Sequence, residues 1–164
     1  MFRSSRVESR PVVPEPHGSG VFGTIVLVAG ILIAAWTVAG RVLFGISGPL
    51  VLIFAFTLGP LLVLVFIYTG LKINRAHRRG HSLRPGLIVC LIAAWFTGLL
   101  FGFTVPDATP EGLQSIIANS SNPWLLEMSI AFCNPAGILC AATAIGALAF
   151  AHVSARGPVL VDED

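Results

Sequence analysis

The sequence predicts an all-α integral membrane protein, built as a bundle of four transmembrane helices. Four stretches, at residues 18 to 40, 42 to 71, 82 to 106 and 128 to 151, contain no Lys, Arg, Asp, Glu or His apart from Arg84. Each can cross ~30 Å of hydrocarbon, which requires about 20 apolar residues in a helix. The chain is 55% apolar and 11% charged, with a mean hydropathy of +0.86, so a water-soluble fold of its 164 residues would have too little polar surface.

The spans are expected to be helices because they are continuous apolar runs, longer than barrel strands and without their alternation. We expect them at about 21–42, 49–71, 85–105 and 126–152, within one membrane domain at 21–153. Residues 1–20 and 154–164 are predicted to be tails, the first of them disordered. A cleaved signal peptide is the alternative at the start, but the run from Val21 to Gly40 exceeds the ~7 to 15 residues of a signal core.

The basic residues predict the orientation of the helices. Nine of the ten Lys and Arg residues fall before the first span, between the second and third, or after the fourth, and Arg41 is the exception. Lys and Arg near a span resist translocation. Both termini and the loop 72–84 are therefore predicted to be cytoplasmic, and the loop 106–125 to face outward. The predicted location is the cell membrane, with multiple passes.

The second span and the loop after it carry two further signals. Gly59-Pro60 predicts a kink, because proline removes a helical hydrogen bond and clashes with the preceding turn. The loop is expected to extend the helix by a turn or two before Gly80 stops it. Its cations predict contact with anionic lipid headgroups of the bilayer. The candidate headgroup residues are Lys72, Arg75, Arg78, Arg79 and Arg84.

Small residues recur at helical spacing in the last two spans. Such stripes let membrane helices approach closely, and they predict helix packing within the bundle, with homodimerisation as the competing interpretation. The candidate packing residues are Ala94, Gly98, Gly102, Gly137 and Ala141.

The outward loop is expected to contain a short helix. Thr109 would be its N-cap, Pro110 its first residue, and Glu111 would lie near the positive end of its dipole. Leu113, Ile116 and Ile117 would then share one face, as in a helix that lies on the membrane surface or over the mouth of the bundle.

The fourth span is interrupted by Asn134-Pro135-Ala136, which predicts either one kinked helix or two shorter helices. The tripeptide resembles the motif of aquaporin water channels. Aquaporins need two copies and six spans, whereas this chain has one copy and four spans, so we do not expect such a channel. Asn134 and Glu127 are nevertheless the candidate residues of a transport path.

The sequence contains no recognisable catalytic signature. Cys90, Cys133 and Cys140 lack the spacing of a redox pair, and Cys133 and Cys140 share a helix face, which indicates packing. No phosphate loop, nucleophile with a base or metal-ligand cluster is evident, so no catalytic, cofactor or metal site is expected. The basic loop lacks the interleaved aromatic residues of a nucleic-acid site.

These observations favour a non-enzymatic structural or accessory membrane component that packs with itself or with a partner membrane protein. The alternative is a small transporter or channel with a path near Pro60, Asn134 and Pro135. The surroundings of Asn134 discriminate between the two functions, because transport requires a water-filled cavity there.

Overall fold

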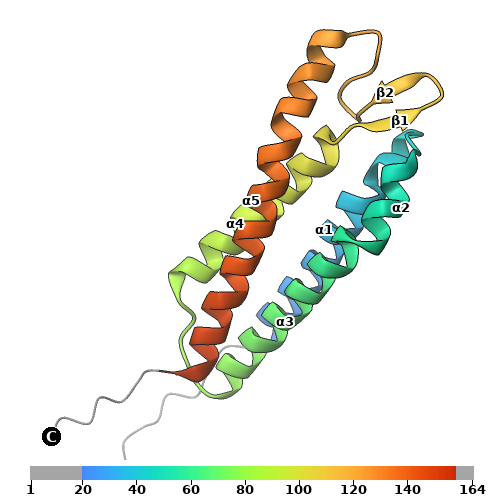
Figure 1. Cartoon of the computed structure of the whole chain (residues 1–164). Helices are drawn as coiled ribbons and strands as arrows, with labels where there is room; N and C mark the ends of the chain where they lie inside the picture. Colours follow the sequence, from blue (N-terminus) through green and yellow to red (C-terminus); the bar gives the residue numbers. More distant parts are fainter. Residues whose placement is uncertain (1–19, 158–164) are drawn as a thin grey trace, which may run out of the picture.

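The structure, a computed structural model, describes residues 20–157, most of which are helical (Figure 1). The predicted tails at 1–19 and 158–164 lie outside the described residues. The elements in chain order are α1 (Val21–Ala39), the 3₁₀ helix η1 (Gly40–Phe44), α2 (Pro49–Phe56), α3 (Leu58–Arg78), α4 (Pro85–Thr104), β1 (Asp107–Thr109), β2 (Gly112–Gln114) and α5 (Pro123–Arg156).

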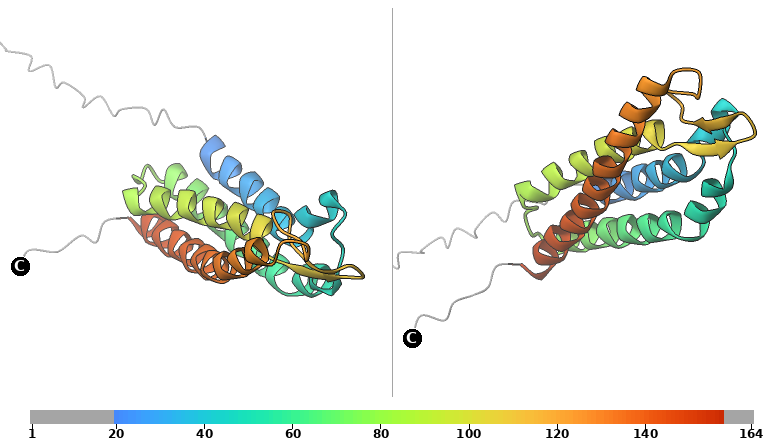
Figure 2. Two further views of the ribbon diagram at one scale, coloured as in Figure 1. Left: turned by 90° about the horizontal axis from the view of Figure 1, so that it is seen from above. Right: turned by 45° about the horizontal axis from the view of Figure 1, so that its top comes forward.

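The long helices form a bundle in which consecutive helices run antiparallel, and α1 packs most extensively against α3, and α4 against α5. Contacts of α3 with α5 and of α1 with α4 close the ring (Figures 1 and 2). The described chain starts and ends at the same end of the bundle as the turn between α3 and α4. We call this the basic end, and the opposite end, which carries β1 and β2, the hairpin end.

Four helical segments within residues 20–157 are long and apolar enough to cross a membrane, judged by length and composition. They are Val21–Phe44, Pro49–Arg78, Pro85–Thr104 and Pro123–Arg156. Many large apolar side chains on them point away from the bundle, including Phe56 at 82% and Ile138 at 70% exposure. A water-soluble protein rarely exposes so continuous an apolar surface.

The bundle interior is apolar and closely packed. The main core cluster joins all four long helices, and a smaller cluster lies toward the hairpin end. Residues of α5 enter these clusters at steps of three and four, which is the periodicity of one helix face. They are Cys133, Ala136, Cys140, Ala144, Ala147 and Ala151.

The second long apolar segment, Pro49–Arg78, is interrupted near the predicted kink. The break lies at Thr57, between α2 and α3, where φ is −117° and ψ is −80°. Pro60 has no N–H for a helical bond to the carbonyl of Phe56, and its ring crowds that carbonyl. The Thr57 hydroxyl bonds the Ile53 carbonyl at 2.6 Å, which satisfies one group at the break.

Helix α3 continues through the basic segment and ends where glycine permits it. Gly80 has a φ of +69°, and the N–H of His81 returns to the carbonyl of Ala76 at 3.0 Å. This is the Schellman arrangement, in which a left-handed residue closes the helix. Helix α5, in contrast, is one continuous helix across Pro135, so of the two predicted alternatives the unbroken helix is the one found.

The predicted short helix after Thr109 is wrong. Residues 107–114 form a two-stranded antiparallel hairpin in which Thr109 pairs with Gly112. Pro110 and Glu111 form its two-residue turn, and Gly112 has a φ of +111°, which an L side chain rarely adopts. The Thr109 side chain donates a hydrogen bond to the Gly112 carbonyl at 2.8 Å and so acts within the turn, not as a helix cap.

Candidate functional site

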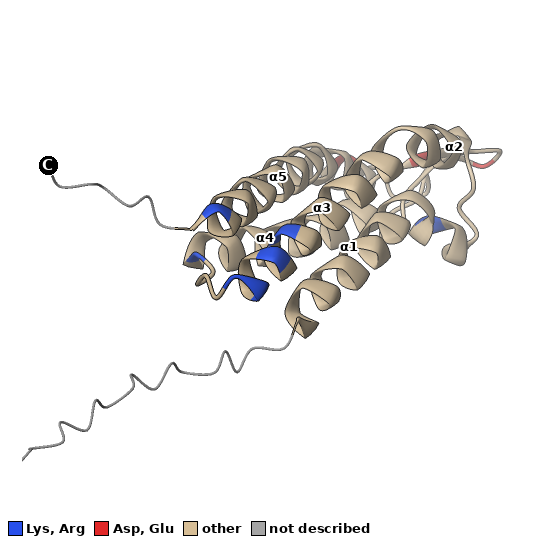
Figure 3. Ribbon diagram, turned by 90° about the horizontal axis from the view of Figure 1, so that it is seen from below, with Lys and Arg blue, Asp and Glu red and all other residues tan. Residues whose placement is uncertain are grey.

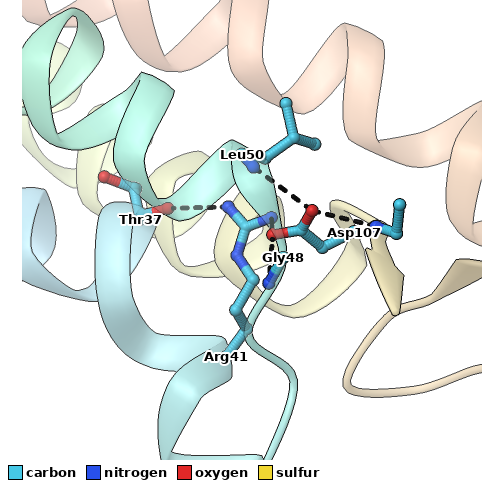
Figure 4. Close-up of polar contacts among 6 residues, drawn as sticks. Thr37, Arg41, Gly48, Leu50 and Asp107 are labelled. Carbon is cyan, nitrogen blue, oxygen red and sulfur yellow. Dashed lines mark hydrogen bonds and ion pairs between the residues drawn. The ribbon is translucent and has the colours of Figure 1, made fainter. Parts of the chain in front are cut away.

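The most deeply buried charges of the described chain lie at the hairpin end. Arg41 is 1% exposed and Asp107 is fully buried. The Arg41 Nη1 atom lies 3.6 Å from Asp107 Oδ2 (Figure 4). The guanidinium also lies over the Phe54 ring, 5.1 Å from its centroid. The Nη2 atom donates to the Thr37 carbonyl at 3.4 Å.

The Asp107 carboxylate has more partners than the guanidinium. It accepts hydrogen bonds from the backbone N–H groups of Gly48 at 3.2 Å, Leu50 at 3.3 Å and Ala108 at 2.9 Å. Gly48 is the N-cap of α2 and has no side chain of its own to bond the first turn. Asp107 therefore caps α2 from a distant part of the chain, at the helix end where a negative charge is favoured.

A second buried polar contact lies at the same end of the bundle. The Ser129 hydroxyl of α5 lies 2.5 Å from the carbonyl oxygen of Thr104 and 2.8 Å from the Ser115 hydroxyl. Ser115 in turn pairs with Ala118 through backbone hydrogen bonds of 2.7 and 3.2 Å. The connection between α4 and α5 is thus tied to both helices at the hairpin end.

Sequence reasoning missed both contacts. In the sequence, Arg41 is the exception to the charge pattern, and Asp107 falls within the predicted outward loop 106–125. The available signal was that two opposite charges border apolar spans on the same predicted side. Because these charges face each other and backbone groups, and because neither is accessible, the arrangement holds elements together and offers no surface to a substrate.

The structure places the candidate packing residues between helices. A Cβ added to Gly98 would lie 2.7 Å from a side-chain carbon of Ile33, and one added to Gly137 would lie 2.9 Å from the Phe101 ring. Gly102 faces the indole of Trp36 in the same way. Ala94 on α4 is fully buried. Ala141, about one turn after Gly137 on α5, is half-buried.

The candidate transport residues do not face the interior. Asn134 and Glu127 on α5 are exposed, as are Pro60 and Pro135. The buried residues on either side of Asn134 and Pro135 are Cys133 and Ala136, which belong to the apolar cluster toward the hairpin end. The surroundings of Asn134 therefore consist of packed side chains on one side and the open bundle surface on the other.

The five candidate headgroup residues all lie at the basic end, but the structure divides them. Lys72, Arg75 and Arg79 line a cavity of about 180 Å³ between α3 and α5. Arg84 lines a separate depression near the end of α5, and Arg78 lines neither of these two. Figure 3 shows the other basic residues gathered at this end, whereas Arg41 lies with the acidic residues at the hairpin end.

Residues from α5 complete that cavity. None of them was predicted from the sequence to contact lipid headgroups. His152, Ala155 and Arg156 form its second wall. The Nη1 atom of Arg79 donates to the Ala155 carbonyl at 3.1 Å, which fixes the arginine against the last turn of α5. Only the three-dimensional proximity of α3 and α5 brings these cations together.

Within the described residues, no three His, Cys, Asp or Glu side chains gather as metal ligands would. The three cysteines are unpaired thiols, and Cys133 and Cys140 are buried in the bundle. No protein-family model, curated protein or solved structure matches the chain. The function proposed below therefore rests on the sequence and the geometry of the chain itself.

Proposed function

We propose that this chain is a multi-pass component of a cell membrane with a non-enzymatic, structural or accessory role, which packs with itself or with a partner membrane protein. In the proposed orientation the basic end is cytoplasmic, as the distribution of Lys and Arg favours. The four long apolar segments and their exposed apolar side chains support insertion into a bilayer.

The observation that carries the accessory role is the position of Asn134. Its amide lies on the outer surface of α5, where the helix otherwise exposes apolar side chains such as Ile138. An amide at this position of a membrane helix gains most when a neighbouring helix supplies a hydrogen-bond partner. Because the interior of the bundle is already filled by its own side chains, a neighbouring membrane helix could reach Asn134 only from the outer face of α5.

The alternative, a small transporter or channel, has less support. A path through the bundle would require Pro60, Asn134 and Pro135 to face inward, and all three are exposed. Transporters also commonly keep ionisable residues inside the membrane for use in transport. The buried Arg41 and Asp107 neutralise each other and tie η1, α2 and the hairpin together, which suits a structural role.

Association in a bilayer tests the proposal. Fluorescently labelled protein would be reconstituted into vesicles at low density, and its oligomeric state would be counted by single-molecule photobleaching. In parallel, cross-linking in native membranes would detect a partner. We expect Asn134→Ala to weaken either association about threefold to thirtyfold, since interhelical hydrogen bonds in membranes contribute about 0.6 to 2 kcal/mol.

The matched control is Phe132→Ala, because residue 132 is also exposed on α5 but lies about 200° around the helix from residue 134. This variant should associate as the unmodified chain does. A chain that remains monomeric and captures no partner in either assay would contradict the accessory role. An ion or solute flux lost in Asn134→Ala vesicles would favour the transporter instead.

A further inference from the structure

The cationic cavity between α3 and α5 continues into an apolar groove on the side of the bundle. The groove has a volume of about 500 Å³ and runs along the same two helices toward the hairpin end. It shares Lys72 and His152 with the cavity, so the two form one continuous surface. The other residues that line the groove are Tyr68, Ile145, Leu148, Ala149 and Val153.

The order of side chains along both helices follows from helical spacing. On α3, Tyr68, Lys72, Arg75 and Arg79 recur at steps of four, three and four, which places them on one face. On α5, Ile145, Ala149, His152 and Arg156 do the same. Both faces therefore change from apolar to basic side chains in the direction of the basic end. The change occurs at Lys72 on α3 and at His152 on α5, which line both the groove and the cavity.

The charge of the cavity is not balanced by acidic side chains of the described chain. The carboxylates among residues 20–157 are Asp107, Glu111 and Glu127, and all three lie at the hairpin end (Figure 3). The ends of α3 and α5 carry partial negative charge, and Arg79 is bonded to one of their carbonyls. Lys72, Arg75 and Arg156 remain to bind an anion.

We propose that this surface binds one anionic phospholipid, with its headgroup phosphate in the cavity and an acyl chain in the groove. A phosphate suits a cluster of Lys and Arg, because several cations can share its oxygens. A chain lying along the groove covers side chains that are otherwise exposed, such as Tyr68 at 54% and Ile145 at 59%. Inorganic phosphate would use the cavity but leave the groove uncovered.

The proposal depends on insertion into a bilayer, as in the proposed function, but not on association through Asn134. The protein would be reconstituted into nanodiscs of phosphatidylcholine with a minor fraction of phosphatidylglycerol. Spin-labelled forms of each lipid would then report, by electron paramagnetic resonance, how strongly the protein immobilises them. We expect a clear preference for phosphatidylglycerol over phosphatidylcholine.

The decisive comparison uses two double variants of equal charge. Lys72→Gln with Arg75→Gln should reduce the preference about thirtyfold or more, because each substitution removes a charged partner of the phosphate inside the cavity. Arg78→Gln with Arg84→Gln, at the same end but outside the cavity, should change it less than about threefold. Equal losses in the two pairs would indicate unspecific surface charge and would overturn the proposal.

The groove and the competing ligands are tested separately. Ala149→Trp should fill the groove and weaken the binding of phosphatidylglycerol while all the charges remain. If inorganic phosphate displaces the spin-labelled lipid as well as unlabelled phosphatidylglycerol does, a free anion is the ligand and the proposal fails. It also fails if the preference appears only after Asp162, Glu163 and Asp164 are replaced by their amides, because the chain's own acidic end would then bind the cavity.

The outcomes distinguish this proposal from the function proposed above. Protein that inserts into nanodiscs but shows no lipid preference contradicts the lipid site and leaves the accessory role standing. Protein that binds the lipid but remains monomeric and captures no partner contradicts the accessory role alone. Failure to insert into any bilayer overturns both.

Discussion

Arg41 and Asp107 form a buried ion pair that joins the end of the first long helix to the hairpin between α4 and α5. Their Nη1 and Oδ2 atoms are 3.6 Å apart, and neither side chain is accessible. The two partners are not equivalent. Asp107 accepts three backbone hydrogen bonds in addition to the ion pair, whereas the guanidinium donates one, to Thr37.

This asymmetry predicts unequal effects of removing each charge. Asp107→Ala leaves a buried guanidinium without its counter-charge and α2 without its cap, so we expect the free energy of unfolding to fall by about 3 to 5 kcal/mol. Arg41→Met leaves a carboxylate that still accepts three N–H groups, and should cost less. Thermal unfolding in mild detergent would measure both variants. An Arg41→Met variant that is as unstable as Asp107→Ala would contradict the assigned roles.

Helices α1 and α3 approach closely at Gly23 and Gly70, where glycine faces glycine. A Cβ added to Gly70 would lie 2.7 Å from the backbone carbonyl oxygen of Gly23, and backbone cannot rotate away as a side chain can. We expect Gly70→Ala to push the helices apart and destabilise the bundle by about 1 to 3 kcal/mol.

Gly146→Ala is the matched control for that substitution. Its added Cβ would lie 3.3 Å from the Sγ atom of Cys90, and that side chain can shift slightly. The control should unfold within a few degrees of the unmodified chain. Equal losses of stability in the two variants, measured in the same detergent, would show that the close approach of the α1 and α3 backbones is not the reason why residue 70 must be glycine.

Ser129 ties the hairpin connection to α5, and Ser129→Ala should release it. The variant leaves the Thr104 carbonyl and the Ser115 hydroxyl without their shared partner, at a cost of about 1 to 3 kcal/mol. We expect faster proteolysis within residues 105–122 in detergent. Thr143→Ala is the control, because that hydroxyl bonds only carbonyls of its own helix. Unchanged proteolysis in Ser129→Ala would refute this role.

Much of the helical architecture was predictable because its signals are local. Apolar runs of sufficient length predicted four spans, and four segments of that kind are present. Gly80 predicted the end of α3, because a glycine readily adopts the left-handed conformation that closes a helix, as Gly80 does here. Pro60 likewise predicted a disturbance of the second span, which lies at Thr57 because the ring crowds the turn before it.

The features that the sequence did not reveal depend on contacts between distant segments. Pro110 suits the first turn of a helix and also the corner of a tight turn, and the local pattern could not decide between them. The pairing of Arg41 with Asp107 requires the tertiary fold, as does the meeting of Lys72 with Arg156 across two helices. No spacing along one helix predicts either contact.

Cysteine labelling in intact cells tests the central claim, which is that the chain crosses a membrane four times with its basic end in the cytoplasm. Single cysteines at Glu111→Cys in the hairpin and Ser82→Cys at the basic end would be placed in a chain whose native cysteines are replaced by alanine. A membrane-impermeant maleimide should label residue 111 in intact cells and residue 82 only after lysis. Labelling of residue 82 in intact cells, or recovery of the chain without membranes, would contradict the account.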